Sequence, residues 1–159
     1  MILAVALAGT VSVVAALGLP AQRSCRDPAA GHGEDIRSAV AVLDAEARPG
    51  DAVLYAPHKL RAIDTWYARQ GRVLNDAAIA VDPLTAQNLA GIEVAPGDLA
   101  ARLSQSPRVW LVHSEALGPS AVTPTDAAKF ALVQGGYVRV AHHTFVSLTV
   151  DLFQREPGR

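Results

Sequence analysis

The chain is organised around the stretch from Arg48 to Pro57, which reads Arg-Pro-Gly-Asp-Ala-Val-Leu-Tyr-Ala-Pro. Pro49 cannot continue a helix, Gly50 can take a positive φ, and Asp51 is favoured in turns. The apolar run of residues 53–55 then indicates a strand, which Pro57 ends. Because the run has little polar content, we expect this strand to be covered on both faces of its sheet.

Helix and strand patterns alternate on both sides of this stretch. The predicted helices cover residues 34–48, 59–70, 96–103 and 123–136, and the predicted strands cover 53–55, 72–76, 109–113, 137–145 and 146–153. The pattern weakens between 77 and 94, where we expect an excursion or loop. This order predicts an α/β domain over residues 34–156, with a small, mainly parallel sheet, helices on both faces and an antiparallel hairpin at the C-terminal edge.

Specific residues are expected at the ends of these elements and in their core. Thr123 can cap the last helix, Pro124 suits its first position, and Asp126 stands where a capping box has its acid. The buried face of that helix is predicted to consist of Ala127, Phe130 and Ala131, with Gly135 and Gly136 closing it. The central core residues are predicted to be Val53, Leu54, Val109, Leu111 and Val138, and Tyr67 is assigned to the core stripe of its helix.

Residues 1–19 contain no charged side chain, and a helix of that length would measure about 28 Å, close to a bilayer core of about 30 Å. We expect a transmembrane helix over residues 1–20, followed by a linker over 21–33. A cleaved signal peptide and a buried helix of a soluble protein are the two alternatives. Cys25 follows Gln22-Arg23-Ser24, which lacks the small apolar residues of a lipoprotein acylation site.

The composition limits the kinds of function that the chain can have. Its 159 residues allow one domain and an appendage. A formal net charge of -1 offers no basic surface for nucleic acid, so we expect no nucleic-acid partner. The segment after the first strand, Ala56-Pro57-His58-Lys59, has no glycine to let a phosphate approach the backbone, which makes a nucleotide-binding enzyme the weakest hypothesis. No pattern of a cofactor, a metal site or a catalytic nucleophile is present.

Candidate binding residues follow the strands. His58 and His113 both come at the end of a predicted strand, the edge at which open α/β sheets bind ligands. Trp66 and Tyr67, with Arg61 and Arg69 nearby, could form a stacking platform for a sugar ring, or Trp66 could instead cover the rim of the domain. The substrate-binding candidates are therefore His58, Trp66, Tyr67 and His113.

Two further polar pairs favour structural roles. His142 and His143 are adjacent on a strand, so they point to opposite faces and cannot share a metal ion. We expect neither to be a ligand. Asn75-Asp76 at a strand end could bind hydroxyl groups, but a turn is favoured.

The chain resembles a known family in the order of its parts. These are an apolar span, a short linker, a helix, the stretch Arg-Pro-Gly-Asp-Ala-Val-Leu-Tyr, and a closing hairpin with Phe145, Val150, Leu152, Phe153 and Arg155. The chain is similar to the C-terminal end of bacterial multi-span glycosyltransferases related to the dolichyl-phosphate-mannose–protein mannosyltransferases, family 39. The resemblance implies a last membrane helix followed by an α/β domain outside the cytoplasm. The family's catalytic acids lie in loops between early membrane helices, and no residue of this chain matches them. The resemblance therefore implies an accessory or interaction domain that cannot transfer sugar alone.

The resemblance also implies partners and a location. The expected partners are the lipid bilayer and a polyprenyl-linked sugar or cell-surface glycan, and the expected location of the domain is outside the cytoplasm at the cell membrane. Arg23 and Arg26 follow the apolar segment, and by the positive-inside rule this favours the opposite orientation. The family interpretation therefore requires upstream helices to set the orientation. The alternative is a self-contained, singly anchored extracytoplasmic domain that binds carbohydrate.

Overall fold

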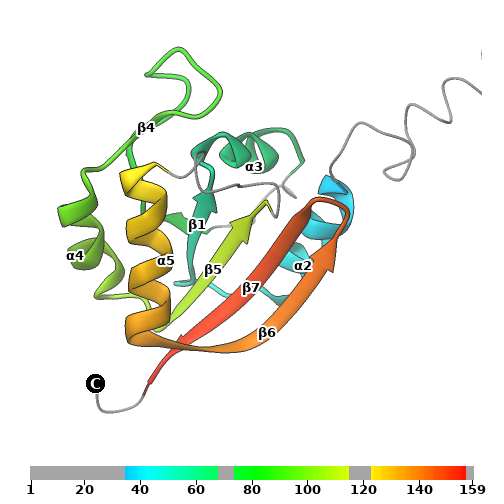
Figure 1. The fold of residues 1–159 in the computed structure, drawn as a ribbon. Helices are drawn as coiled ribbons and strands as arrows, with labels where there is room; N and C mark the ends of the chain where they lie inside the picture. The colour runs from blue at the N-terminus through cyan, green and yellow to red at the C-terminus, as the bar shows by residue number, and fades with distance from the viewer. Residues whose placement is uncertain (1–34, 68–73, 115–122, 157–159) are drawn as a thin grey trace, which may run out of the picture. The chain divides into compact units, whose positions relative to one another are not determined.

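The computed structural model describes residues 35–67, 74–114 and 123–156 of the chain (Figure 1). The chain divides into two units, residues 1–34 and Asp35–Arg159, and all described residues belong to the second. The predicted membrane helix of residues 1–20 and the predicted linker of 21–33 lie outside the described residues. Of the helices within the described ranges, none combines the length and the apolar character that crossing a bilayer requires.

Helices and strands alternate along the described chain until it ends in a hairpin. The helical elements are α2 (Ile36–Glu46), the 3-10 turn η2 (His58–Arg61), α3 (Ala62–Tyr67), the 3-10 turn η3 (Pro96–Asp98), α4 (Leu99–Leu103) and α5 (Pro124–Gly136). The strands are β1 (Ala52–Ala56), β2 (Asn75–Asp76), β3 (Ile79–Val81), β4 (Ile92–Glu93), β5 (Arg108–His113), β6 (Tyr137–Phe145) and β7 (Leu148–Arg155). The predicted excursion of residues 77–94 contains β3 and β4, which pair as a small separate sheet.

The main sheet has the strand order β2-β1-β5-β7-β6, with helices on both of its faces as predicted (Figure 1). β1 pairs in parallel with β2 and β5, whereas β7 pairs antiparallel with both β5 and β6. The antiparallel pairings are the longer ones, so the prediction of a mainly parallel sheet is wrong. The C-terminal antiparallel hairpin is confirmed.

The reason for this difference lies in how the two hairpin strands are buried. Residues 148–153 of β7 are all buried, which suits a strand inside the sheet. Along β6 most side chains are exposed or half-buried, so β6 takes the edge and β7 inserts beside β5. Val138 lies on β6 and is 49% exposed, so its assignment to the central core is wrong.

The turn before β1 forms as its sequence predicts. Gly50 has a φ of 91°, and the Asp51 amide donates to the Arg48 carbonyl at 3.0 Å. The Asp51 carboxylate accepts from the Arg48 amide at 3.0 Å and from the Trp110 indole N–H at 2.9 Å. Asp51 therefore links the turn to the neighbouring strand β5, and all five residues of β1 are buried.

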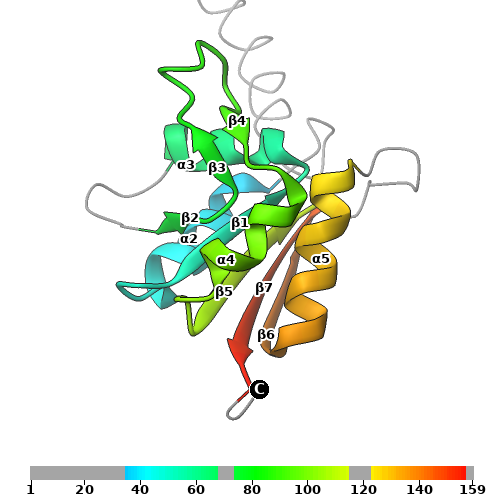
Figure 2. The same ribbon diagram turned by 90° about the vertical axis from the view of Figure 1, so that its left-hand side faces the viewer.

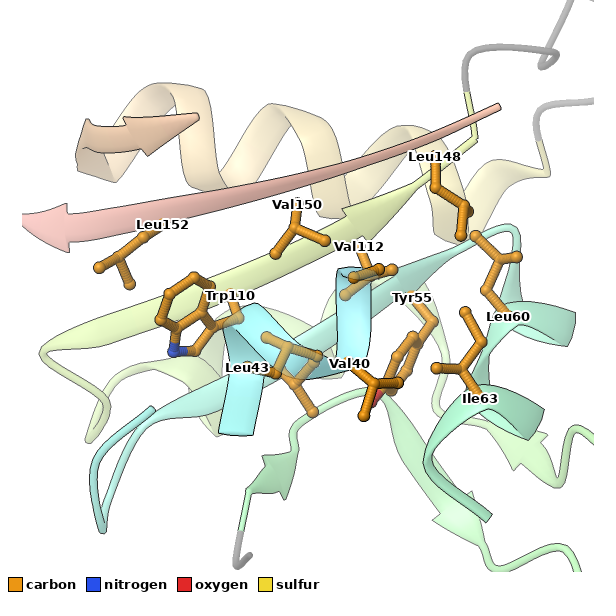
Figure 3. Packing of buried hydrophobic residues seen from close by; sticks show 12 residues of the cluster. Val40, Leu43, Tyr55, Leu60, Ile63, Trp110, Val112, Leu148, Val150 and Leu152 are labelled. Atoms are coloured by element: carbon orange, nitrogen blue, oxygen red, sulfur yellow. The ribbon is translucent and has the colours of Figure 1, made fainter. Parts of the chain in front are cut away.

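Two apolar clusters cover the two faces of the sheet. Helices α2 and α3 cover one face, where Val40 and Leu43 pack against Tyr55, Trp110 and other strand residues (Figure 3). Helices α4 and α5 cover the other face, in a cluster that contains Leu54, Leu99, Leu103, Val109, Leu111, Val133 and Phe153. Each such side chain contributes roughly 1.5–3 kcal/mol when fully buried. The predicted core residues Val53, Leu54, Val109 and Leu111 are confirmed as buried.

Helix α5 begins as predicted but buries a different face. Thr123 accepts from the Asp126 amide at 3.1 Å, Pro124 is the first helical residue, and the helix ends at Gly136. The predicted buried face was Ala127, Phe130 and Ala131, but Ala127 and Ala131 are exposed and Phe130 is half-buried. The buried side chains are instead Asp126, Lys129 and Val133. Two of these three are charged, so an apolar pattern could not locate the face.

Candidate functional site

The strands β1 and β5 end together at one edge of the main sheet, which we name the carboxyl edge, where Ala56 pairs with His113. The short strand β2 ends earlier, at Asp76, which pairs with Val53 of β1 and is followed by the chain that leads to β3. Helix α3 and the β3–β4 segment lie at the same end of the molecule (Figures 1 and 2). Open α/β sheets bind ligands at this edge, and His58 and His113 are predicted to lie there.

Three of the predicted site residues come from the segment that follows β1. His58 begins η2 directly after β1 and is half-buried. Tyr67 ends α3 and is 47% exposed, so its assignment to the core stripe is wrong. Trp66 lies in the same helix, but its side chain is outside the described part, so the stacking platform remains a prediction.

His113 faces α5 instead of a free surface. Its ring meets the ring of Phe130 edge-on at 5.5 Å, and its Nε2 lies 3.2 Å from Oδ2 of Asp151. The other carboxylate oxygen of Asp151 lies 2.6 Å from Nδ1 of His142 on the neighbouring strand. The Asp151 carboxylate is buried, whereas the His142 side chain is 49% exposed. His142 is therefore joined to a core carboxylate, although the sequence assigned it no partner.

The most densely charged part of the carboxyl edge is a group of five buried or nearly buried side chains, which we call the edge network: Arg61, Asp76, Glu93, Asp126 and Lys129. The Lys129 ammonium lies 2.7 Å from Oε1 of Glu93 and 2.8 Å from Oδ1 of Asp126, and it donates to the Tyr55 carbonyl at 2.6 Å. Arg61 donates to the same oxygen of Glu93 at 2.9 Å and forms an ion pair with Asp76. Glu93 thus joins the two cations.

The network holds its charges inside the protein. Lys129 and Asp126 are fully buried, and Arg61 is nearly so. Burial alone would lower the pKa of the Arg61 guanidinium, but its hydrogen bonds and charge interactions with Asp76 and Glu93 outweigh burial and raise that pKa. Burial would raise the pKa of Asp126, but the hydrogen bond and charge of Lys129, helped by Thr123, hold it below its ordinary range. The charged forms of Arg61 and Asp126 are therefore favoured.

This arrangement restricts what the carboxyl edge can bind. Two cations face three carboxylates, which leaves one negative charge in excess and disfavours a phosphate or another anion. The cations also fill the space between the carboxylates. Within the described ranges, no cluster of three or more His, Cys, Asp and Glu side chains could hold a metal ion. The network cross-links η2, β2, β4 and α5.

Comparison with the models of protein families, with characterised proteins and with solved structures finds no match.

Sequence reasoning named only part of the edge network. It placed Asp126 in a capping box, Arg61 beside the aromatic pair and Asp76 in a turn, and it assigned nothing to Lys129 or Glu93. Asp76 does form the predicted turn, since its Oδ1 accepts from the Ala78 amide at 3.0 Å, and it also binds Arg61. The spacing of Asp126 and Lys129, three residues apart on a helix, was the available signal for a buried ion pair.

Two hollows of the described part lie away from these residues. One, of about 390 Å³, is lined by α4, α5 and the side chains of Tyr137 and Arg155. The other, of about 560 Å³, lies between the end of α2 and strand β6, beside Arg48 and Arg108. Neither is lined by His58, Trp66, Tyr67 or His113. The predicted binding residues thus share an edge of the sheet but not one of these hollows.

Proposed function

We propose that the chain is the membrane-attached C-terminal part of a multi-span glycosyltransferase that uses a lipid-linked sugar. Residues 1–20 form its last transmembrane helix, and residues 34–156 form an accessory or interaction domain outside the cytoplasm. The proposal rests on the resemblance and on the uncharged run of residues 1–19. In this arrangement, the catalytic acids belong to other parts of the enzyme.

The observation that carries the accessory role is the edge network. At the edge where an α/β enzyme would place its reacting groups, Lys129 and Arg61 are already bound to carboxylates of the same domain. We infer that cations paired in this way hold η2, β2, β4 and α5 together and do not act on a substrate. The excess of negative charge also disfavours the phosphate of a lipid-linked sugar at this edge.

The genomic sequence upstream of Met1 tests the proposal directly. An in-frame extension with further apolar spans and an early acidic loop is expected. A stop codon followed by a ribosome-binding site would contradict the glycosyltransferase assignment. The membrane attachment is tested by alkaline extraction of cell membranes. The full chain should stay in the membrane pellet, and a variant without residues 1–20 should not.

A second candidate function is a singly anchored domain that binds carbohydrate. It is favoured by the exposure of Tyr67, whose ring is available for stacking on a sugar. Titrating the full chain in detergent with sugars, while Trp fluorescence is followed, tests this role. A saturable change that Tyr67→Ala abolishes and His143→Ala leaves intact would support it. The absence of any saturable change at millimolar sugar would count against it.

A further inference from the structure

Large apolar side chains are exposed at the end of the molecule that carries the carboxyl edge. Between β3 and β4 the chain forms a projecting loop of residues 82–91, which we call the apical loop (Figure 2). Its Leu84 is 87% exposed and its Leu89 is 62% exposed. Ile92 follows directly in β4 and is 52% exposed. All three lie in one short segment of the chain, and contiguous exposed apolar surface is typical of sites that contact a partner or a membrane.

The apical loop has a defined shape that holds the leucines outward. Oδ1 of Asp82 accepts from the amides of Leu84 and Thr85, both at 3.0 Å. Oδ1 of Asn88 accepts from the amides of Ala90 and Gly91, at 2.9 and 2.6 Å. Side chains at both ends of the loop thus fix its backbone. The exposure of the leucines is therefore a property of an ordered loop.

The base of the loop is fixed to the core. Arg61, which is nearly fully buried, donates to the Ala90 carbonyl, and Glu93 is bound by both Arg61 and Lys129. Gly91 has a φ of 70°, and a Cβ at this position would lie 2.6 Å from the Val81 carbonyl oxygen. The edge network thus also positions the apical loop. A loop held in this way can present its apolar side chains in one direction.

The composition of the loop suits a bilayer surface. Residues 83–92 read Pro-Leu-Thr-Ala-Gln-Asn-Leu-Ala-Gly-Ile and contain no charged residue. Moving a charged side chain towards the hydrocarbon is costly, whereas leucine favours it. The polar side chains of this segment are suited to the headgroup region, since they can still meet water there. The loop therefore has an apolar tip, and its one charged side chain, Asp82 at its base, is bound to the amides of Leu84 and Thr85.

The chain enters the domain at the same end as the apical loop. The Asp35 amide donates to the carbonyl of Val146, in the turn between β6 and β7, at 3.1 Å. The start of β7 lies beside the end of β5, where Thr149 pairs with His113, and Figure 1 shows the turn at the end of the sheet that carries the apical loop. The predicted linker before Asp35 can span at most roughly 50 Å when it is fully extended. If residues 1–20 span a bilayer, a linker of this reach allows the apical loop to touch the bilayer surface.

We propose that the apical loop docks on the membrane surface, with Leu84 and Leu89 inserted into the interfacial region of the bilayer. This inference rests on the proposed membrane attachment and adds a second point of contact to it. Apolar side chains on a polar scaffold enter the boundary between headgroups and acyl chains in this way. Two contacts, one from the helix and one from the loop, fix the orientation of the domain above the membrane.

The test uses the full chain in vesicles of phosphatidylcholine and phosphatidylglycerol. Cys25→Ser removes the native thiol, and Ala86→Cys provides a site for an environment-sensitive dye on the apical loop. A matched chain carries the dye at Gln134→Cys, on the exposed side of α5. We expect lipids brominated in the upper acyl chain to quench the dye at position 86 and to leave the dye at position 134 unchanged. Leu84→Ser with Leu89→Ser should lower the membrane occupancy of the loop by about tenfold or more.

The outcomes separate this inference from the proposed function. If the chain floats with the vesicles but only water-soluble quenchers reach the dye at position 86, the docking inference is wrong and the proposed membrane attachment stands. If the chain does not float with the vesicles at all, both are overturned. A dye at position 86 that neither water-soluble nor lipid quenchers reach would indicate a protein surface over the loop, which also overturns membrane docking. Equal lipid quenching in the double-serine variant would show that the leucines are not the inserted groups.

Discussion

The two faces of the central sheet are both covered by helices, but different chemistry closes them. On the α2 face, apolar side chains such as Leu43 and Trp110 fill the interface. On the α5 face, the apolar cluster is continued at the carboxyl edge by Lys129 and Asp126, which are as deeply buried as the leucines. An apolar contact can be lost in parts, whereas a buried ion pair that loses one partner leaves an unpaired charge. The two faces should therefore respond differently to substitution.

Both faces depend on β1, and the largest effect is expected there. Leu54→Asp places a carboxylate in the apolar cluster of the α5 face, and Val53→Asp does the same on the α2 face. The lost burial and the desolvation of the charge should exceed a typical stability of about 5–15 kcal/mol. We expect neither variant of residues 34–159 to show a cooperative thermal transition. A Leu54→Asp variant that melts like the parent would show that β1 is not a buried central strand.

The next largest effect is expected for Lys129→Ala, on the charged part of the α5 face. It leaves Asp126 and Glu93 without their shared cation and should cost about 3–5 kcal/mol. Urea unfolding followed by circular dichroism measures this loss. The combined variant Lys129→Met, Asp126→Asn, Glu93→Gln removes charges of both signs. It should be more stable than Lys129→Ala, and the opposite order would argue against the buried-charge explanation.

A somewhat smaller effect is expected for Leu43→Ala on the α2 face. The substitution removes a fully buried side chain and leaves a cavity, at a cost of about 2–5 kcal/mol. No charge is left unpaired, so the loss should be independent of salt and of pH. Urea unfolding at two salt concentrations measures this. A loss that changes with salt would indicate that the two faces are not as different as the structure indicates.

The sequence predicts the apolar contacts of both faces better than the charged network, for a physical reason. The stretch from Arg48 to Pro57 specifies its own turn and strand, because Pro49, Gly50 and Asp51 act locally. The strand order depends on how β7 and β6 share burial, which emerges only when the hairpin packs beside β5. The pairing of Lys129 with Glu93 joins residues 36 positions apart, and no periodic pattern marks such a contact. The same holds for Arg61 and Asp76.

The pH dependence gives a finer comparison between the faces. The pKa of Asp126 is lower in the folded protein than its ordinary value, so its contribution to stability is complete above a pH of about 3.9. That contribution is lost as the pH falls through the lowered pKa. As the pH is lowered from 5, the free energy of unfolding should therefore fall less in the Asp126→Asn variant than in the parent. Urea midpoints across this range measure the difference, and parallel curves would rule out a role for Asp126.

The smallest effect is expected for His142→Ala. His142 and His113 both contact the Asp151 carboxylate, and His142 is the more exposed of the two. His142 is half exposed, and an interaction at such a position is worth about 0–1 kcal/mol, even at 2.6 Å from Asp151. His143→Ala is the matched control, because its Nε2 lies 3.6 Å from Glu46 and makes no hydrogen bond. His113→Ala should cost more than either, since it also removes the ring contact with Phe130. Thermal unfolding of the three variants gives the order, and a His142→Ala loss as large as that of His113→Ala would show that Asp151 needs both histidines. The charged interactions of the α5 face would then extend across β7 to the edge strand β6. The exposed position of His142 would not predict a small contribution to stability.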